Sequence, residues 1–149
     1  MMMKKLILII SILFSSAIFA QQSQSKYQQE MALKMIQPQI APITQAALDL
    51  AELQKYFHSK SVVFSEEAPF NAENLKVVTK FNKPIEVLKP ADIAKKKVKK
   101  YLSINDWDIT MNDCKLELNF IGEGILISYT LRKTNNKWIV TSFQITPKK

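Results

Sequence analysis

The sequence predicts an α+β protein, with helices in the N-terminal and central parts of the chain packed on a C-terminal antiparallel sheet. Apolar residues recur at helical spacing in several segments between residues 26 and 102. From residue 107 onward, apolar and polar residues alternate, which is typical of strands with one apolar face. The segment "LISYTLRKTNNKWIVTSFQI", residues 126–145, adds two strands around a tight turn.

Residues 1–20 have the layout of a secretory signal peptide. Lys4 and Lys5 precede the uncharged run Leu6–Phe19, and the small residue Ala20 stands before the polar "QQSQS". The run is shorter than the ~20 apolar residues that cross a bilayer. We therefore expect cleavage after Ala20, a flexible leader at residues 21–25, a single domain at residues 26–149, and a periplasmic or secreted location.

Three helices are expected before the four C-terminal strands, with a short strand at residues 61–65 and weaker extended segments between the second helix and the third. The first covers Lys26–Gln37, and Pro38 should end it because proline cannot continue the hydrogen-bond ladder. Pro42 suits the first turn of a second helix, which extends to Phe57. The third lies in "KPADIAKKKVKKYL" and should extend to Leu102, with apolar residues on one face and lysines on the other.

The register of the last hairpin has two solutions. A two-residue loop at Asn135-Asn136 places Leu131 opposite Val140 and Trp138 on the side of Tyr129, whereas a three-residue connection sets Leu131 against Ile139. Either register leaves apolar residues on both faces. We therefore expect the outer sheet face to be covered, by the chain itself or by a second copy in a homodimer.

The order of elements resembles the nuclear transport factor 2-like superfamily, which includes the SnoaL-like cyclases. The segments that carry the resemblance are "LQKYFHSKSVVF", "LKPADIAKKKVKKYL", "LISYTLRK" and "KWIVTSFQI", and it covers Lys26–Thr146. The resemblance implies a cystatin-like cone, in which a curved sheet wraps around its helices. Such cones serve as ligand pockets, as active sites or as filled cores, often in dimers.

No catalytic set of that superfamily can be matched to this sequence, because the strand faces expected to point inward are apolar. Tyr129 is the one titratable group among them, either facing a pocket or bonded to backbone as a core tyrosine. His58 is the only histidine, which excludes a multi-histidine metal site, and a capping or surface role at a helix end is favoured. The candidate pocket residues are Trp107, Phe120, Tyr129, Phe143 and Tyr56.

Charge and cysteine content narrow the function further. The chain has a formal net charge of +8, and Lys95, Lys96, Lys99 and Lys100 form a basic surface suited to an acidic partner. Nucleic-acid binding is not expected, because aromatic platforms are not interleaved with these lysines. Cys114, the single cysteine, is expected to be buried, with pairing between chains as the alternative. Two glycines cannot build a phosphate-binding loop, so we expect no cofactor. We expect no metal either, because the chain has one histidine and the spacing of Asp106, Asp108 and Asp113 is not that of a calcium loop.

These observations favour an exported, non-catalytic binding protein. It would hold a small apolar molecule in the cone or a protein partner on its surface. The alternatives are an inhibitor or immunity-type factor for an acidic partner, and a SnoaL-like enzyme in which Tyr129 and a carboxylate converge in an open cavity.

Overall fold

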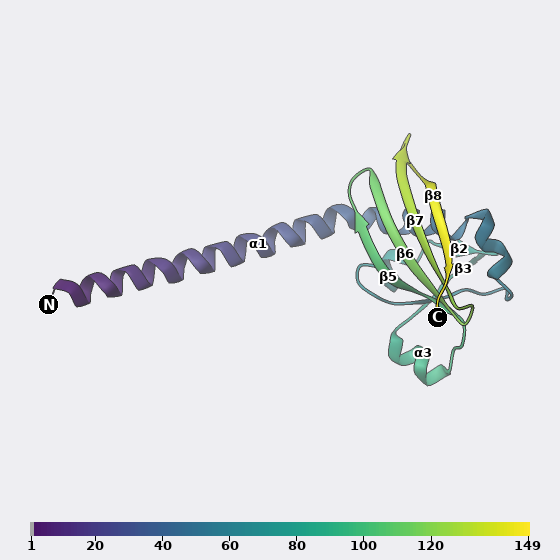
Figure 1. Ribbon diagram of the computed structural model, residues 1–149, viewed down its shortest axis with the longest axis horizontal. Helices are drawn as coiled ribbons and strands as arrows, with labels where there is room; N and C mark the ends of the chain where they lie inside the picture. Colours follow the sequence, from purple (N-terminus) through teal and green to yellow (C-terminus); the bar gives the residue numbers. More distant parts are fainter. Residues whose placement is uncertain (1) are drawn as a thin grey trace. The chain divides into compact units, whose positions relative to one another are not determined.

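The computed structural model describes the backbone of residues 2–149 and the side chains of residues 21–149 (Figure 1). The expected signal peptide, residues 1–20, lies outside the residues whose side chains are described. The chain divides into two compact units, Met1–Met35 and Ile36–Lys149. In the first unit, every described side chain is exposed, including those of Gln21–Ser25, which continue the helix. No helix among the described residues is long and apolar enough to span a membrane.

Helix α1 (Met2–Leu48) contains both Pro38 and Pro42, so the predicted break at Pro38 is wrong. Each proline removes one hydrogen bond of the helix, but both are exposed, and water can reach the carbonyl groups that lose their donors. The opposite face packs on the sheet through a fully buried stripe that holds the helix together across the prolines: Ile40, Ile43, Ala47 and Leu48. The second predicted helix is therefore the end of α1, followed by the 3₁₀ helix η1 (Ala51–Tyr56).

The sheet has six strands in the order β4-β1-β5-β6-β7-β8 and is curved but not closed (Figure 1). The short strands β1 (Val63–Ser65) and β4 (Glu86–Leu88) pair in parallel, and β1 also pairs in parallel with β5 (Tyr101–Ile109). The antiparallel meander continues through β6 (Asp113–Ile121), β7 (Ile125–Thr134) and β8 (Lys137–Pro147). The expected α+β fold, with helical segments packed on a curved sheet, is confirmed.

Short elements connect β1 to the meander. Helix α2 (Ala72–Leu75) follows β1, and a two-stranded hairpin of β2 (Thr79–Lys80) and β3 (Lys83–Pro84) precedes β4. Buried side chains from this region, among them Phe70, Leu75 and Val78, belong to the same core as the sheet.

Helix α3 (Pro90–Lys96) is shorter than predicted, because residues 97–102 are not helical. Lys97 adopts a left-handed conformation, its amide donates to Ala94, and the amide of Val98 donates to Ile93. This is the Schellman arrangement that ends a helix, and its usual hydrophobic contact explains why Ile93 and Val98 are the apolar residues turned inward. The chain then enters β5, where Leu102 pairs with strands on both sides.

The register of the last hairpin follows the two-residue alternative. Asn135 and Asn136 both have positive φ, which suits a two-residue turn, and Leu131 lies opposite Val140. A bulge follows, so that Phe143 comes to lie opposite Tyr129. The bulge turns most apolar residues of β8 to the concave face, and Ile139 and Leu126 remain on the outer face. The homodimer stays a prediction.

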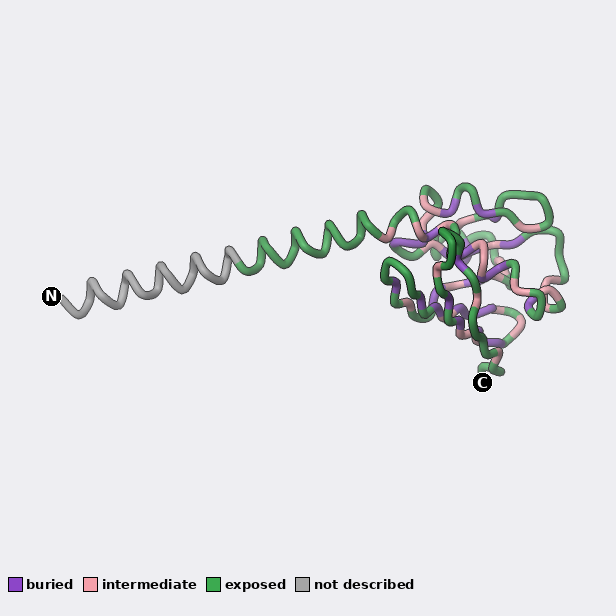
Figure 2. The backbone as a smooth tube through the Cα atoms, turned by 90° about the horizontal axis from the view of Figure 1, so that it is seen from above, coloured by how far each residue is buried: buried purple, intermediate pink, exposed green. Residues whose placement is uncertain are grey.

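The core fills the concave side of the sheet. Inward residues of β5 to β8 pack against α1, η1 and β1, and a bulge in β5 between Ile104 and Asp106 keeps Ile104 and Trp107 on the same face. Figure 2 shows the buried positions concentrated within residues 36–149. The middle of the predicted cone is thus occupied by side chains, and space for a ligand has to be sought at its end.

Candidate functional site

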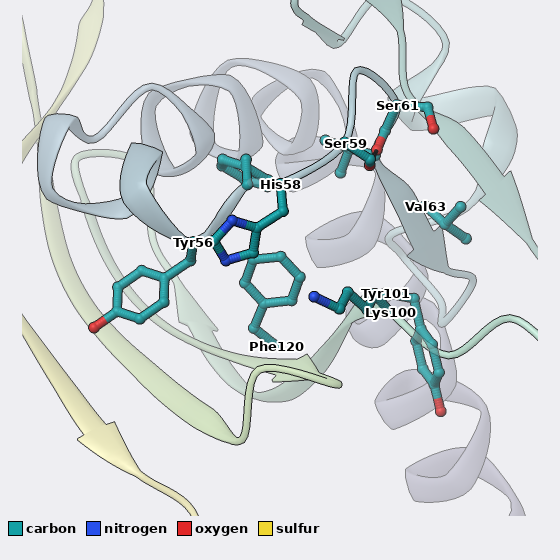
Figure 3. Close-up of a pocket in the computed structure, with 10 residues that line it drawn as sticks. Tyr56, His58, Ser59, Ser61, Val63, Lys100, Tyr101 and Phe120 are labelled. Atoms are coloured by element: carbon teal, nitrogen blue, oxygen red, sulfur yellow. Dashed lines mark hydrogen bonds between the residues drawn. The ribbon is translucent and has the colours of Figure 1, made fainter.

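A cavity of about 270 Å³ opens where β1 and β5 begin and β6 ends. It is lined by Tyr56, Phe57, His58, Ser59, Ser61, Val62, Val63, Lys100, Tyr101 and Phe120 (Figure 3). We call it the mouth pocket. Strand pairing assembles it from three distant segments, because β1 lies beside β5, and Leu102 of β5 lies opposite Phe120 of β6.

Aromatic rings form the apolar wall of the mouth pocket. The rings of Phe57 and Phe120 are 5.4 Å apart, and Phe57 also meets Phe81 edge-on at 5.8 Å. Such ring pairs are stabilising beyond their simple burial. Phe57 is therefore held from two sides, and the wall it forms is preorganised for an apolar ligand.

Lys80 supports this wall from behind. Its ammonium lies 5.2 Å from the ring centroid of Phe57 and donates a 2.9 Å hydrogen bond to the carbonyl of Leu48 at the end of α1. Burial lowers the pKa of Lys80, and the nearby Asp49 partly offsets this effect. At a helix C-terminus the last carbonyls lack backbone amide donors, and here Lys80 and the side-chain amide of Gln54 both donate to Leu48. Lys80 therefore links Phe57 to the helix end.

Two groups that line the pocket, Lys100 and His58, are connected through Glu123, which lies outside the cavity in the turn after β6. The ammonium of Lys100 donates to Glu123 at 2.6 Å, and the other oxygen of Glu123 lies 3.6 Å from Nε2 of His58. The hydrogen bond from Lys100 is the main reason why the pKa of Glu123 is lowered, with further contributions from the charges of Lys100 and His58. Glu123 therefore stays ionised and fixes one side of the Lys100 ammonium.

Gly122 allows this contact. Its φ is +90°, and a Cβ at this position would lie 2.5 Å from the carbonyl oxygen of Lys99. Any side chain would push the turn after β6 away from Lys99 and Lys100. The glycine thus brings Glu123 within reach of Lys100.

The structure brings together two of the five predicted pocket residues, Tyr56 and Phe120. Trp107 lies elsewhere, half-buried with its ring 6.2 Å from that of Phe70, and Phe143 is 40% exposed on the edge strand β8. Tyr129 is buried in the core and donates a 3.1 Å hydrogen bond to Ala47. Burial raises the pKa of Tyr129, so the hydroxyl keeps its proton. Tyr129 is therefore a core tyrosine bonded to backbone, the second of the two roles considered from the sequence.

The predicted basic surface divides into two parts. Lys95 and Lys96 lie in the last turn of α3, where Lys96 pairs with Glu86 at 3.1 Å. Lys99 and Lys100 follow the helix, and Lys100 alone reaches the mouth pocket. All four side chains are exposed.

Residues 21–149 hold no group of three or more histidine, cysteine or acidic side chains that could bind a metal ion. Cys114 is buried on the concave face, and burial raises its pKa to about 12, which keeps it a neutral thiol. The buried position expected from the sequence is confirmed.

Sequence reasoning missed Phe57, Tyr101 and Glu123 as members or supports of a site. Phe57 was assigned to a helix face and Tyr101 to the third helix, whereas the pocket depends on strand pairings between distant segments. One signal was available: glycine is rare in this chain, and Gly122 and Gly124 flank Glu123 in a single turn. Two glycines on either side of Glu123 indicate a tight turn that holds this charged residue in a fixed position.

Together, the fold and site define a small α+β domain with an aromatic-walled pocket at one end of a curved sheet. A solved structure from Shewanella baltica OS155, described as an NTF2-like protein of unknown function, is similar to this chain. The identity is 17%, the match covers 82% of this chain and 97% of the other, and the TM-score is 0.27. The fold described for this chain rests on the helix and strand arrangement given above. No protein-family model and no curated protein matches the sequence.

Proposed function

We propose that this protein binds a small molecule with an apolar body in the mouth pocket and does not transform it. The observation that carries the proposal is the preorganised wall of Phe57 and Phe120 beside a cavity of about 270 Å³. Ligand sites are mostly apolar concavities with a few placed polar groups, and their volumes begin near ~300 Å³. The ligand is therefore at the small end of that range.

The geometry gives no support to a SnoaL-like enzyme built on Tyr129. That alternative required the Tyr129 hydroxyl and a carboxylate to converge in an open cavity, whereas the hydroxyl is bonded to Ala47 within the core. Export, expected from residues 1–20, belongs to the proposal and would place the pocket outside the cytoplasm.

The test is binding of 1-octanol, a neutral probe, followed by amide chemical shifts in the protein. We expect shift changes at residues 57–63, 101 and 120. Ser61→Trp places a large ring in the pocket and should lower the affinity about tenfold or more. Ser142→Trp, on the exposed β8 strand, is the matched control and should leave the affinity unchanged. Absence of binding, or equal loss in both variants, would overturn the proposal.

A second candidate is the binding of an acidic protein partner through the lysines around α3. Lys95 and Lys99 are exposed and have no acidic partner among residues 21–149, so their charge is available. Binding of this kind weakens as salt screens the charges. A pull-down at low and high salt, with wild type and with the double variant Lys95→Glu/Lys99→Glu, tests it. If the amount of acidic partner captured is the same at both salt concentrations and in both proteins, this candidate is wrong.

A further inference from the structure

The charge of the mouth pocket is one-sided. Among the residues that line it, Lys100 is the cation, His58 is the other group that can carry a positive charge, and no aspartate or glutamate takes part. The two tyrosines, Tyr56 and Tyr101, add neutral phenols. Any ligand that fills the cavity therefore meets a positive group and no negative one on its wall.

The geometry of Lys100 leaves it able to bind a second anion. An ammonium has three N–H donors, and the hydrogen bond to Glu123 uses one of them. The side chain is 53% exposed, so a ligand can approach without first breaking a buried contact. Figure 3 shows the ammonium directed toward the group formed by His58 and Phe120, on the pocket side.

Glu123 does not close the site to anions. It does not line the cavity, and it contacts Lys100 and His58 from the turn between β6 and β7. The carboxylate of Glu123 orients the ammonium of Lys100, and it also places one negative charge near the ligand. Lys97 and Lys99 precede Lys100 in the chain and are exposed, and neither lines the cavity.

We infer that the ligand of the mouth pocket has an anionic end, a carboxylate or a similar small oxyanion, attached to its apolar body, and that Lys100 binds this end. This inference rests on the proposed function of the pocket. A neutral ligand offers the ammonium at most a neutral acceptor such as a hydroxyl, and a cationic ligand would be repelled; an anion accepts charge-assisted hydrogen bonds, which are about twice as strong as neutral ones. The apolar body then lies against Phe57 and Phe120.

The experiment compares three probes of one chain length at neutral pH: octanoate, 1-octanol and octylammonium, titrated into the full chain. We expect octanoate to bind more tightly than 1-octanol by up to about fivefold, because an ion pair with a half-exposed ammonium contributes up to about 1 kcal/mol. Octylammonium should bind most weakly. The preference for octanoate should shrink at high salt.

Substitutions distinguish binding by Lys100 itself from a nonspecific effect of the protein's positive charge. Lys100→Met should reduce octanoate binding to the level of 1-octanol and leave 1-octanol unchanged. Lys96→Met, an exposed lysine that also pairs with a glutamate, is the matched control and should change neither. Glu123→Gln removes the competing charge and should tighten octanoate binding severalfold, again without effect on 1-octanol.

The outcomes distinguish the two proposals. If no probe binds, the proposed function fails. If 1-octanol and octanoate bind alike in the wild type, or if Lys96→Met lowers octanoate affinity as much as Lys100→Met does, the pocket stands and the anionic end is wrong.

Discussion

The hydroxyl of Tyr129 donates a hydrogen bond of 3.1 Å to the carbonyl oxygen of Ala47, joining β7 to the last turn of α1 inside the core. The carbonyl groups of a last helical turn lack regular amide donors, and the amide of Leu50 approaches this one only to 3.4 Å. The strand therefore supplies what the helix end lacks.

Tyr129→Phe should lower the free energy of unfolding by about 0.5–1.5 kcal/mol, because the buried carbonyl of Ala47 loses the shorter of its two hydrogen bonds while the ring is retained. Urea denaturation measures the change. The matched control is Tyr27→Phe, whose side chain is 64% exposed and which should change stability by no more than about 0.5 kcal/mol. Equal effects at the two positions would contradict the role given to the Tyr129 hydroxyl.

Pro42→Ala should stabilise the protein. The alanine amide can bond to the carbonyl of Pro38, and alanine is about 3 kcal/mol better than proline inside a helix. The more restricted unfolded chain of the wild type offsets up to about 1 kcal/mol of this gain. We expect an increase of about 1–2 kcal/mol in the free energy of unfolding, and a change within about 0.5 kcal/mol for Pro84→Ala in the exposed strand β3. A destabilised Pro42→Ala would show that the proline serves packing.

These residues show where sequence patterns were sufficient and where they were not. The alternation predicted the meander and the inward faces of β6 and β7, since burial of one sheet face fixes that pattern. It did not predict the inward face of β8, where Ile139 lies on the outer face and the bulge brings Val140 and Phe143 to the same side. Local rules failed at Pro38, where packing of Ile40 and Ile43 outweighs the lost hydrogen bond, and at Lys97, where a lysine takes the position usually held by glycine.

The candidate site was harder to predict, for a physical reason. Tyr56 and Phe120 were identified as apolar side chains near the sheet, but their meeting with Lys100 and Val62 depends on the parallel pairing of β1 with β5. Such a pairing joins segments far apart in the chain, and a single sequence carries no pattern that specifies it. The expectation that Tyr129 lines a pocket required its hydroxyl to lack a partner, and the partner is a backbone carbonyl that no side-chain pattern reveals.

The buried thiol of Cys114 should make the protein less stable in alkaline solution. Its pKa is about 12 in the folded protein against an ordinary value of 9.0, so the unfolded chain loses this proton first as the pH rises. The free energy of unfolding then falls between about pH 9 and 12, by at most about 1.4 kcal/mol per pH unit for one proton. Urea midpoints at pH 8, 9 and 10 measure the slope.

Cys114→Ala is the control for this effect. The variant should be less stable at every pH because it leaves a small cavity, but its stability should fall less between pH 9 and 10. Tyr129, whose pKa is also raised by burial, contributes to the loss above about pH 10 in both proteins. Parallel slopes in wild type and variant would contradict the assignment to Cys114.

The two glycines of the turn after β6 provide a matched pair that links the fold to the pocket. Both have positive φ, +90° for Gly122 and +65° for Gly124, so alanine is strained at either position. Only at Gly122 would the new Cβ collide with backbone, at 2.5 Å from the Lys99 carbonyl, whereas the nearest atom to a Cβ on Gly124 lies 3.9 Å away. The difference in stability between Gly122→Ala and Gly124→Ala therefore measures the effect of the close contact between Gly122 and the Lys99 carbonyl.

Gly122→Ala should destabilise the protein by at least about 1 kcal/mol more than Gly124→Ala, the cost typical of overpacking a close contact. It should also weaken octanoate binding severalfold, because displacing Lys99 and Lys100 separates the ammonium from Glu123 and from the pocket. Urea denaturation and titration with octanoate measure the two effects. Equal losses of stability in the two variants would refute the close approach, and unchanged octanoate affinity in Gly122→Ala would show that the position of Lys100 does not depend on this turn.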